Sequence, residues 1–162
     1  MQDKEINQDL HDWIDALENL ILFNGKEYAS ELVNNFVKTA VDKKKLSIFE
    51  PHFRRNYVHI KDVIGSFIFA IENFNKVKNN IYNLGLSSAN LSKLMLAKKI
   101  KKHLKVTKIK IIKNRKDPDK RDYFVSNKKI EKKGFKAKID IDKGIQELIE
   151  VYKSHKDFIN NY

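Results

Sequence analysis

The chain has 162 residues, which is enough for one compact domain with a short addition and too few for two domains of ordinary size. Hydrophobic residues make up 41% of it and support a packed core, while the lack of cysteine excludes disulfides and thiolate metal sites. The net charge is +12, but only four of the 33 basic residues are Arg, the type that recognises phosphates and bases with two parallel hydrogen bonds.

Neither a membrane segment nor a metal site is indicated. The first 15 residues are polar and acidic, unlike a secretory signal, and no apolar run approaches the roughly 20 residues that span a bilayer. The five His are scattered without the spacing of a zinc ligand pair. We therefore expect a soluble, cytoplasmic protein without a metal.

The charge is unevenly distributed along the chain. Residues 1–32 hold eight acidic residues against two lysines, a formal charge of −6, which leaves +18 for the rest. Such asymmetry indicates two segments with different histories or partners. We expect a helical hairpin over 1–42, a main domain over 43–157 and a tail over 158–162.

The elements alternate between helix and strand after the hairpin. Apolar residues at helical spacing predict a first helix over 8–23 and a second that begins near Tyr28 and ends before Lys43. Short apolar runs and periodic stretches then predict an α/β domain. Its expected strands are 46–49, 57–60, 80–84 and 106–112, with a short extended piece at 123–125, and its expected helices are 62–74, 91–104, a turn from Ser126 to Gly134, and 142–152.

Four landmarks occur in one order across the main domain. They are the run Arg54-Arg55-Asn56-Tyr57-Val58-His59-Ile60-Lys61-Asp62-Val63, the run Ile81-Tyr82-Asn83-Leu84-Gly85, the loop Asp117-Pro118-Asp119-Lys120-Arg121-Asp122-Tyr123, and the stretch from Lys128 to Gly134-Phe135. This order resembles the substrate-binding half of the extended short-chain dehydrogenase/reductase family of NAD-dependent nucleotide-sugar epimerases and dehydratases. One departure is Asn56, because the family has Asp there.

The resemblance implies a small substrate-binding α/β domain, here without its Rossmann domain, and a nucleotide-sugar as ligand. It implies that Arg55 and the loop residues Arg121 and Arg115 contact the diphosphate, and that Phe49 and Glu50 approach the base. The alternatives are a surface Arg55 paired with Asp62 or Glu50, and solvated loop charges.

The resemblance also implies what this chain lacks. A complete family member binds NAD(P), but the five glycines here are too far apart to form a phosphate-binding turn. The family's catalytic Tyr and Lys stand one helical turn apart, and the one Tyr-x-x-x-Lys, Tyr57 and Lys61, falls where a strand meets a helix. We expect a packed Tyr57, a solvated Lys61, no catalytic residue and no cofactor in this chain.

The first segment resembles a different family. The run Trp13-Ile14-Asp15-Ala16-Leu17, followed by Gly25-Lys26-Glu27, is similar to the N-terminal docking segment of the homodimeric pyruvate dehydrogenase E1 component. This similarity implies an acyltransferase-type docking partner.

Three functions are therefore open. One is a truncated or split epimerase/dehydratase, completed by a Rossmann-domain chain if split, and another is a non-catalytic interaction module. The third is a nucleic-acid binder, which we do not expect although residues 98–121 hold 12 basic residues, since lysines on wet faces are ordinarily solvated.

Overall fold

The computed structural model describes residues 29–115 and 122–159, and side chains from Leu32 to Arg115 and from Asp122 to Ser154. By internal contacts the chain divides into two compact units, residues 1–32 and 33–162. The expected helix over 8–23 lies outside the described residues, and so does Arg121. The expected second helix is present as α2 (Ala29–Lys43), whose Val37 and Ala40 are buried.

A two-stranded parallel sheet joins distant parts of the second unit. β1 (Lys45–Ile48) pairs with β4 (Lys108–Ile111), with Lys45 opposite Lys108 and Ile48 opposite Ile111. Leu46 and Ile48 point into the core while Lys45 and Ser47 face outward, as the period of two in a strand requires. The lysine-rich alternation of 106–112 predicted a strand at this place, but β4 is limited to Lys108–Ile111 and Ile111 is 46% exposed, so the expected division into a wet face and a buried face is not observed.

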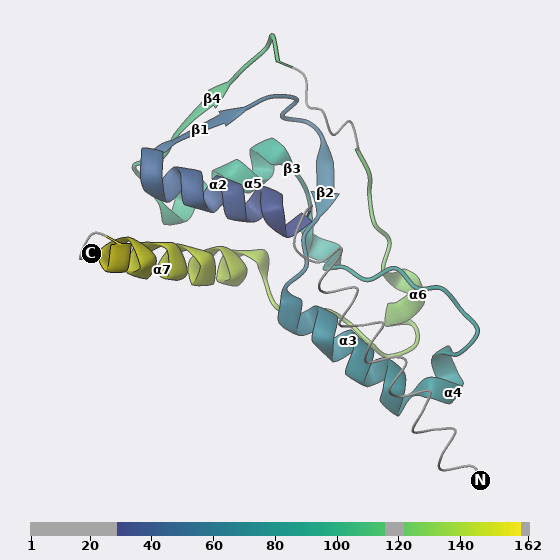
Figure 1. Ribbon diagram of the computed structural model, residues 1–162. Coiled ribbons are helices and arrows are strands. Elements are labelled where there is room, and N and C mark those ends of the chain that lie inside the picture. The colour runs from purple at the N-terminus through teal and green to yellow at the C-terminus, as the bar shows by residue number, and fades with distance from the viewer. Residues whose placement is uncertain (1–28, 116–121, 160–162) are drawn as a thin grey trace. The chain divides into compact units, whose positions relative to one another are not determined.

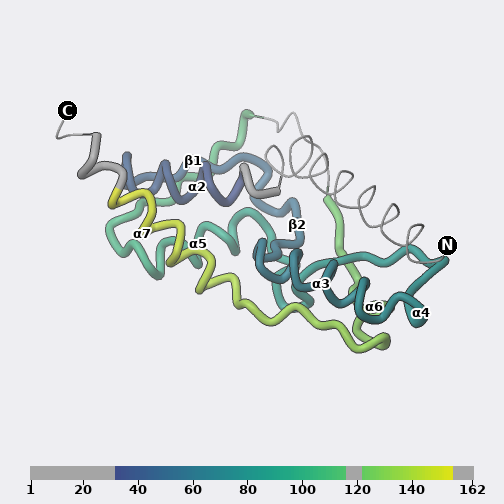
Figure 2. Tube along the Cα trace, turned by 60° about the horizontal axis from the view of Figure 1, so that its bottom comes forward, coloured from purple at the N-terminus to yellow at the C-terminus, as the bar shows by residue number. Residues whose placement is uncertain are grey.

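One helix packs beside this sheet, and a second helix packs against the first. α5 (Lys93–His103) contacts β1 and β4, and it also contacts α7 (Ile141–Ile159), which runs beside it in both Figure 1 and Figure 2. Ser92 caps α5 by accepting a hydrogen bond from the Met95 amide at 3.2 Å. The apolar side chains at the centre of this packing are fully buried: Leu46, Ile48, Leu96, Ile100 and Ile145.

A second, antiparallel pair of strands precedes the next helix. β2 (Arg54–Asn56) pairs with β3 (Asn90–Ser92), which follows the short 3-10 helix η1 (Ser87–Ala89). The expected strand over 57–60 is wrong, because the His59 side chain accepts a hydrogen bond from the Lys61 amide and α3 (Ile60–Glu72) begins at once.

The remaining elements are short. The expected helix over 62–74 is broken at Asn73, and α4 (Phe74–Val77) follows it. Residues 80–84 form no strand. The predicted turn after Ser126 exists as α6 (Lys128–Glu131), but its N-cap is Asn127, and Gly134 then takes a left-handed φ of 108°.

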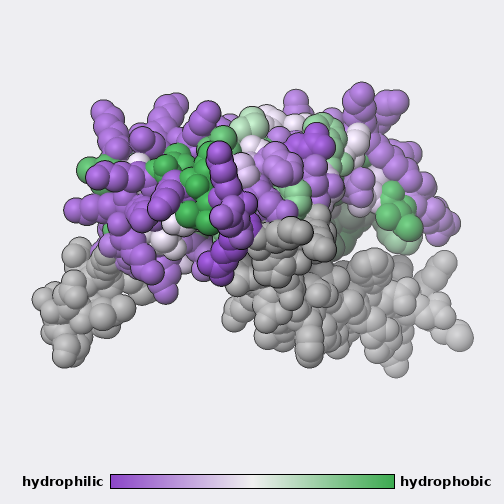
Figure 3. Space-filling model, turned by 90° about the horizontal axis from the view of Figure 1, so that it is seen from above, coloured by the Kyte–Doolittle hydropathy of each residue, from purple (hydrophilic) through white to green (hydrophobic). Residues whose placement is uncertain are grey.

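The coloured part of the face seen in Figure 3 is largely hydrophilic, with apolar patches between the hydrophilic side chains. None of the described helices is long and apolar enough to cross a membrane.

Candidate functional site

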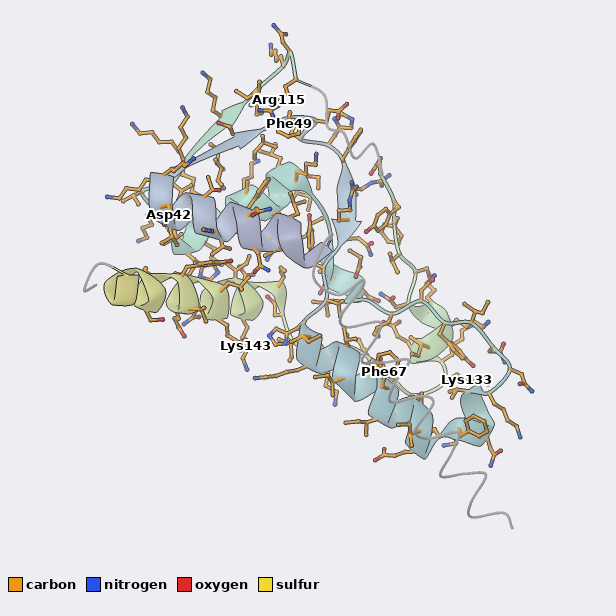
Figure 4. All side chains as sticks on the ribbon, viewed as in Figure 1. Asp42, Phe49, Phe67, Arg115, Lys133 and Lys143 are labelled. Carbon is orange, nitrogen blue, oxygen red and sulfur yellow. The ribbon has the colours of Figure 1, made fainter. Side chains whose placement is uncertain are left out.

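The carboxyl ends of β1 and β4 meet at one edge of the parallel sheet. Phe49 follows β1 directly and Arg115 follows β4 after a short turn, so the ladder brings residues 66 positions apart to the same edge. The Arg115 guanidinium carbon lies 5.2 Å from the centroid of the Phe49 ring, and Figure 4 shows the two side chains together there. The carboxyl edge of parallel strands is where open α/β folds bind ligands.

A buried lysine holds Phe49 in place. The Lys93 ammonium donates a hydrogen bond to the Phe49 carbonyl at 3.3 Å and lies 5.1 Å from the centroid of its ring. It also lies 5.3 Å from the ring of Phe53, and only 3% of Lys93 is exposed. Phe49 therefore contacts one buried cation and one exposed cation.

The sequence interpretation missed Lys93. A signal was present, because Lys93 occupies the first position of α5, where the positive end of the helix dipole disfavours a cation. A lysine at that position requires a local reason, which the carbonyl of Phe49 and the two aromatic rings provide.

The loop between β1 and β2 is tightly turned. The backbone of Glu50 has a left-handed φ of 47°, which residues other than glycine rarely adopt. The Glu50 carbonyl accepts a hydrogen bond from the Phe53 amide at 3.2 Å. The amides of Lys93 and Leu94 donate to the carbonyls of this loop, at Phe53 and Pro51. The loop that carries Phe49 and Glu50 is thus fixed to the start of α5.

Arg55 lies in a second group, on β2. It is 6% exposed, it donates a hydrogen bond to the Arg54 carbonyl at 2.8 Å, and its guanidinium carbon lies 5.2 Å from the ring centroid of Tyr123. The alternative of a surface Arg55 is therefore wrong. Its suggested partner Asp62 is instead hydrogen-bonded to the amides of Lys138 and Ile139.

Arg54 and Asp122 connect the loop after the undescribed residues 116–121 to β2. Asp122 accepts from the Arg54 backbone amide at 2.8 Å and from its side chain at 3.1 Å, and these bonds lower the pKa of Asp122. Since Tyr123 covers Arg55, this loop returns to the strand that carries Arg55. Arg121 immediately precedes Asp122 in the sequence.

Tyr57 lies next to this second group, with 3% of the residue exposed. Burial raises the pKa of Tyr57, and the nearby Arg55 lowers it by less. A catalytic phenol that exchanges protons near neutral pH needs the opposite shift. Lys61 is exposed on the first turn of α3, so Tyr57 and Lys61 do not lie on one helix.

The described glycines do not form a dinucleotide-binding turn. Gly65 and Gly144 lie within helices, Gly85 is pressed against Asn56, and Gly134 takes the left-handed turn after α6. Gly85 and Gly134 thus have a packing and a turn role, and none of these four glycines lies in a glycine-rich strand-to-helix turn. Among the side chains of residues 32–115 and 122–154, no three His, Asp or Glu gather as a metal site would require.

No family model matches the sequence. Several solved structures share its fold. RMD from Pseudomonas aeruginosa, complexed with NADPH, matches with a TM-score of 0.65 and 13% identity over 80% of this chain and 44% of that chain. The ADP-L-glycero-D-manno-heptose-6-epimerase of Helicobacter pylori matches with a TM-score of 0.60 and 25% identity over 79% of this chain and 39% of that chain.

The UDP-Glc/GlcNAc 4-epimerase from Campylobacter jejuni matches with a TM-score of 0.57 and 20% identity over 85% of this chain and 44% of that chain. The chain has the α/β fold of part of the nucleotide-sugar epimerases and reductases. It spans less than half the length of these three proteins. The resemblance of residues 1–32 to pyruvate dehydrogenase E1 rests mostly on residues before Ala29, which lie outside the described residues, and it stays a prediction.

Proposed function

We propose that this chain is the substrate-binding part of a truncated or split NAD-dependent nucleotide-sugar epimerase or dehydratase, which retains recognition of a nucleotide-sugar diphosphate but not hydride transfer. The observation that carries the proposal is the contact between Arg115 and Phe49 at the carboxyl edge of the parallel sheet. The shared fold with nucleotide-sugar enzymes supports the same class of ligand.

The chemistry of this edge suits a nucleoside diphosphate. Arg115 is exposed, and a guanidinium offers a planar set of donors that matches two phosphate oxygens at once. The Phe49 ring contacts that guanidinium, and Lys93 contacts the same ring and donates a hydrogen bond to the Phe49 carbonyl. We assign the diphosphate contact to Arg115, with Arg121 and Arg55 as further cations for it, and assign Phe49 and Glu50 to the base side.

The chain would then act as a binding unit. Tyr57 is packed with a raised pKa, and the described glycines are not grouped in a phosphate-binding turn, which supports binding without hydride transfer. A Rossmann domain would supply the NAD(P) site and the catalytic pair, and a separate Rossmann-domain chain is the partner we propose if the enzyme is split.

Isothermal titration calorimetry with UDP-, GDP- and dTDP-sugars tests the proposal, with NADH and duplex DNA as further ligands. We expect at least one nucleotide-sugar to bind, and Arg115→Ala to weaken its binding about tenfold, as the loss of a charge-assisted bond predicts. Lys113→Ala is the matched control, because it removes the same charge from an exposed position two residues away and should leave the affinity unchanged.

The opposite pattern would reject the proposal. If no nucleotide-sugar binds at millimolar concentration while duplex DNA binds with a steep dependence on salt, the chain is a nucleic-acid binder.

A further inference from the structure

The lysine at the start of α5 combines two features that are unfavourable for a lysine. Lys93 is only 3% exposed, and an ammonium loses its hydration when it is buried. It also occupies the first position of α5, directly after the N-cap Ser92, where the positive end of the helix dipole disfavours a cation. Lys93 is therefore a poor choice for the stability of this helix.

The contacts of the Lys93 ammonium compensate for its burial. It lies 5.1 Å from the ring centroid of Phe49 and 5.3 Å from that of Phe53, and it donates a hydrogen bond to the Phe49 carbonyl at 3.3 Å. An apolar side chain of similar volume would fill the same space without these contacts, and replacing buried charged groups by well-packed apolar ones is often neutral or stabilising. Stability alone therefore does not account for a lysine at this position.

Phe49 connects Lys93 to the candidate diphosphate contact. The Arg115 guanidinium carbon lies 5.2 Å from the centroid of the same ring. The two cations are thus within roughly 10 Å of each other, a separation at which like charges repel. An anion bound to Arg115 would reduce this repulsion, so the arrangement favours a negatively charged ligand.

The loop that carries Phe49 is attached to the same turn of α5. The Lys93 amide donates a hydrogen bond to the Phe53 carbonyl at 3.0 Å. The Leu94 amide donates to the Pro51 carbonyl, also at 3.0 Å. These backbone bonds hold the later part of the loop, and the Lys93 side chain adds a bond at Phe49 itself.

We propose that Lys93 is a positioning residue of the nucleotide-sugar site, which holds Phe49 so that its ring orients the Arg115 guanidinium for the diphosphate. Lys93 is buried and acts through Phe49, not by touching the ligand. Proteins retain residues that reduce stability where function requires them. This inference rests on the proposed function for its ligand, but the orientation of Arg115 is measurable without one.

Lys93→Met tests the proposal, because methionine keeps an unbranched apolar side chain and removes the ammonium. Isothermal titration calorimetry should show an affinity for the nucleotide-sugar at least about fivefold lower, the factor that corresponds to a desolvated cation–π contact. The midpoint of urea unfolding should be equal to or above that of the wild type. A residue that only stabilised the fold would lower this midpoint.

Lys98→Met is the matched control. Lys98 is exposed on the same helix, so the variant loses the same charge without losing a contact to the loop. It should change neither the affinity nor the midpoint of unfolding.

A double-mutant cycle tests whether Lys93 acts through Phe49. Phe49→Leu alone should weaken binding of the nucleotide-sugar. Adding Lys93→Met to it should weaken binding no further, because the ring that Lys93 positions is already absent. If the two losses of affinity multiply instead, Lys93 acts on the ligand by another route.

Nuclear magnetic resonance measures the orientation of Arg115 in the ligand-free chain. Protons of the Arg115 side chain near the Phe49 ring should be shifted upfield by its ring current. The shift should disappear in Phe49→Leu, become smaller in Lys93→Met and stay unchanged in Lys98→Met.

Three results would overturn the proposal. They are a Lys93→Met variant that keeps the wild-type shift of Arg115, a fall of its unfolding midpoint below that of the wild type, and losses of affinity that multiply in the double variant. If the wild-type chain binds no nucleotide-sugar while the Arg115 shift depends on Lys93, the proposed function fails and the coupling of Lys93 to Arg115 stands.

Discussion

Asn56 and Leu86 exchange two hydrogen bonds. The Asn56 side-chain amide donates to the Leu86 carbonyl at 2.9 Å, and its oxygen accepts from the Leu86 amide at 3.0 Å. Asn56 is 8% exposed and Leu86 is 7% exposed, so water cannot replace either bond freely. The position therefore requires a side chain that both donates and accepts, which accounts for Asn where the resembled family has Asp.

Asn56→Asp should destabilise the fold by about 2–3 kcal/mol at neutral pH, because a carboxylate cannot donate to the Leu86 carbonyl and would be charged in a buried place. Urea unfolding measures the loss. Since burial would raise the folded-state pKa of the new carboxyl, the difference from wild type should shrink as the pH falls below about 5. Asn75→Asp, at an exposed position of α4, serves as the control and should change stability by less than about 0.5 kcal/mol.

Gly85 is fixed by the same amide. A Cβ at Gly85 would lie 2.2 Å from the Asn56 side-chain oxygen and 2.8 Å from its carbonyl carbon. Gly85→Ala should therefore displace Asn56 and destabilise the fold by at least about 2 kcal/mol in urea unfolding. At Gly65, within α3, the added methyl would meet only the Phe135 ring at 3.7 Å. Gly65→Ala should instead stabilise the fold by up to about 1 kcal/mol, and equal losses at both glycines would contradict this account.

Much of the helix content could be predicted from sequence, and less of the strand content. α2 and α5 follow from apolar residues at helical spacing to within a few residues at their ends, whereas α7 continues seven residues beyond its expected end at Tyr152. The segment 80–84 has the apolar pattern of a strand but no backbone ladder. It is held by side chains instead, since Lys129 donates to the Ile81 carbonyl and Asn83 to the Ser126 carbonyl. A sequence pattern does not distinguish these two kinds of extended segment.

The sequence singled out Phe49 and Arg115 as candidate site residues, but it did not predict that the two side chains contact each other. Phe49 and Arg115 were both expected to contact the ligand, and the parallel pairing of β1 with β4 brings them together. That pairing joins strands about 60 residues apart, and no local pattern encodes it. Lys93 was missed because the sequence of a lysine-rich chain does not show which lysine is buried.

Replacing Arg55 or Arg115 by alanine should change the free energy of unfolding by different amounts. Arg55 is buried against Tyr123 and holds a backbone carbonyl, so Arg55→Ala should lower the free energy of unfolding by about 2–4 kcal/mol. Arg115 is exposed, so Arg115→Ala should change stability by less than about 0.5 kcal/mol. Urea unfolding of both variants is the measurement, and it determines which arginine can be used in binding tests without loss of the fold. A stable Arg55→Ala variant would show that its buried contacts contribute little.

The start of α7 should make stability depend on pH in the acid range. Lys99 donates a hydrogen bond to Asp142, and His103 Nε2 lies 3.0 Å from the same carboxylate. Partial burial raises the pKa of Asp142, but the bonds from Lys99 and His103 outweigh it and lower that pKa to about 2. Because the folded pKa lies below the unfolded value, the ionised carboxylate stabilises the fold above about pH 4, and this contribution is lost as the pH falls toward 2.

Asp142→Asn should therefore destabilise the fold by about 1–2 kcal/mol at pH 7, with the unfolding curves of variant and wild type converging near pH 2. Glu150→Gln, at an exposed position of the same helix, is the control and should track the wild type from pH 7 downward within about 0.5 kcal/mol. A deficit in Asp142→Asn that is the same at every pH would show that the variant loses packing and not a charge, since only the charged interaction disappears on protonation.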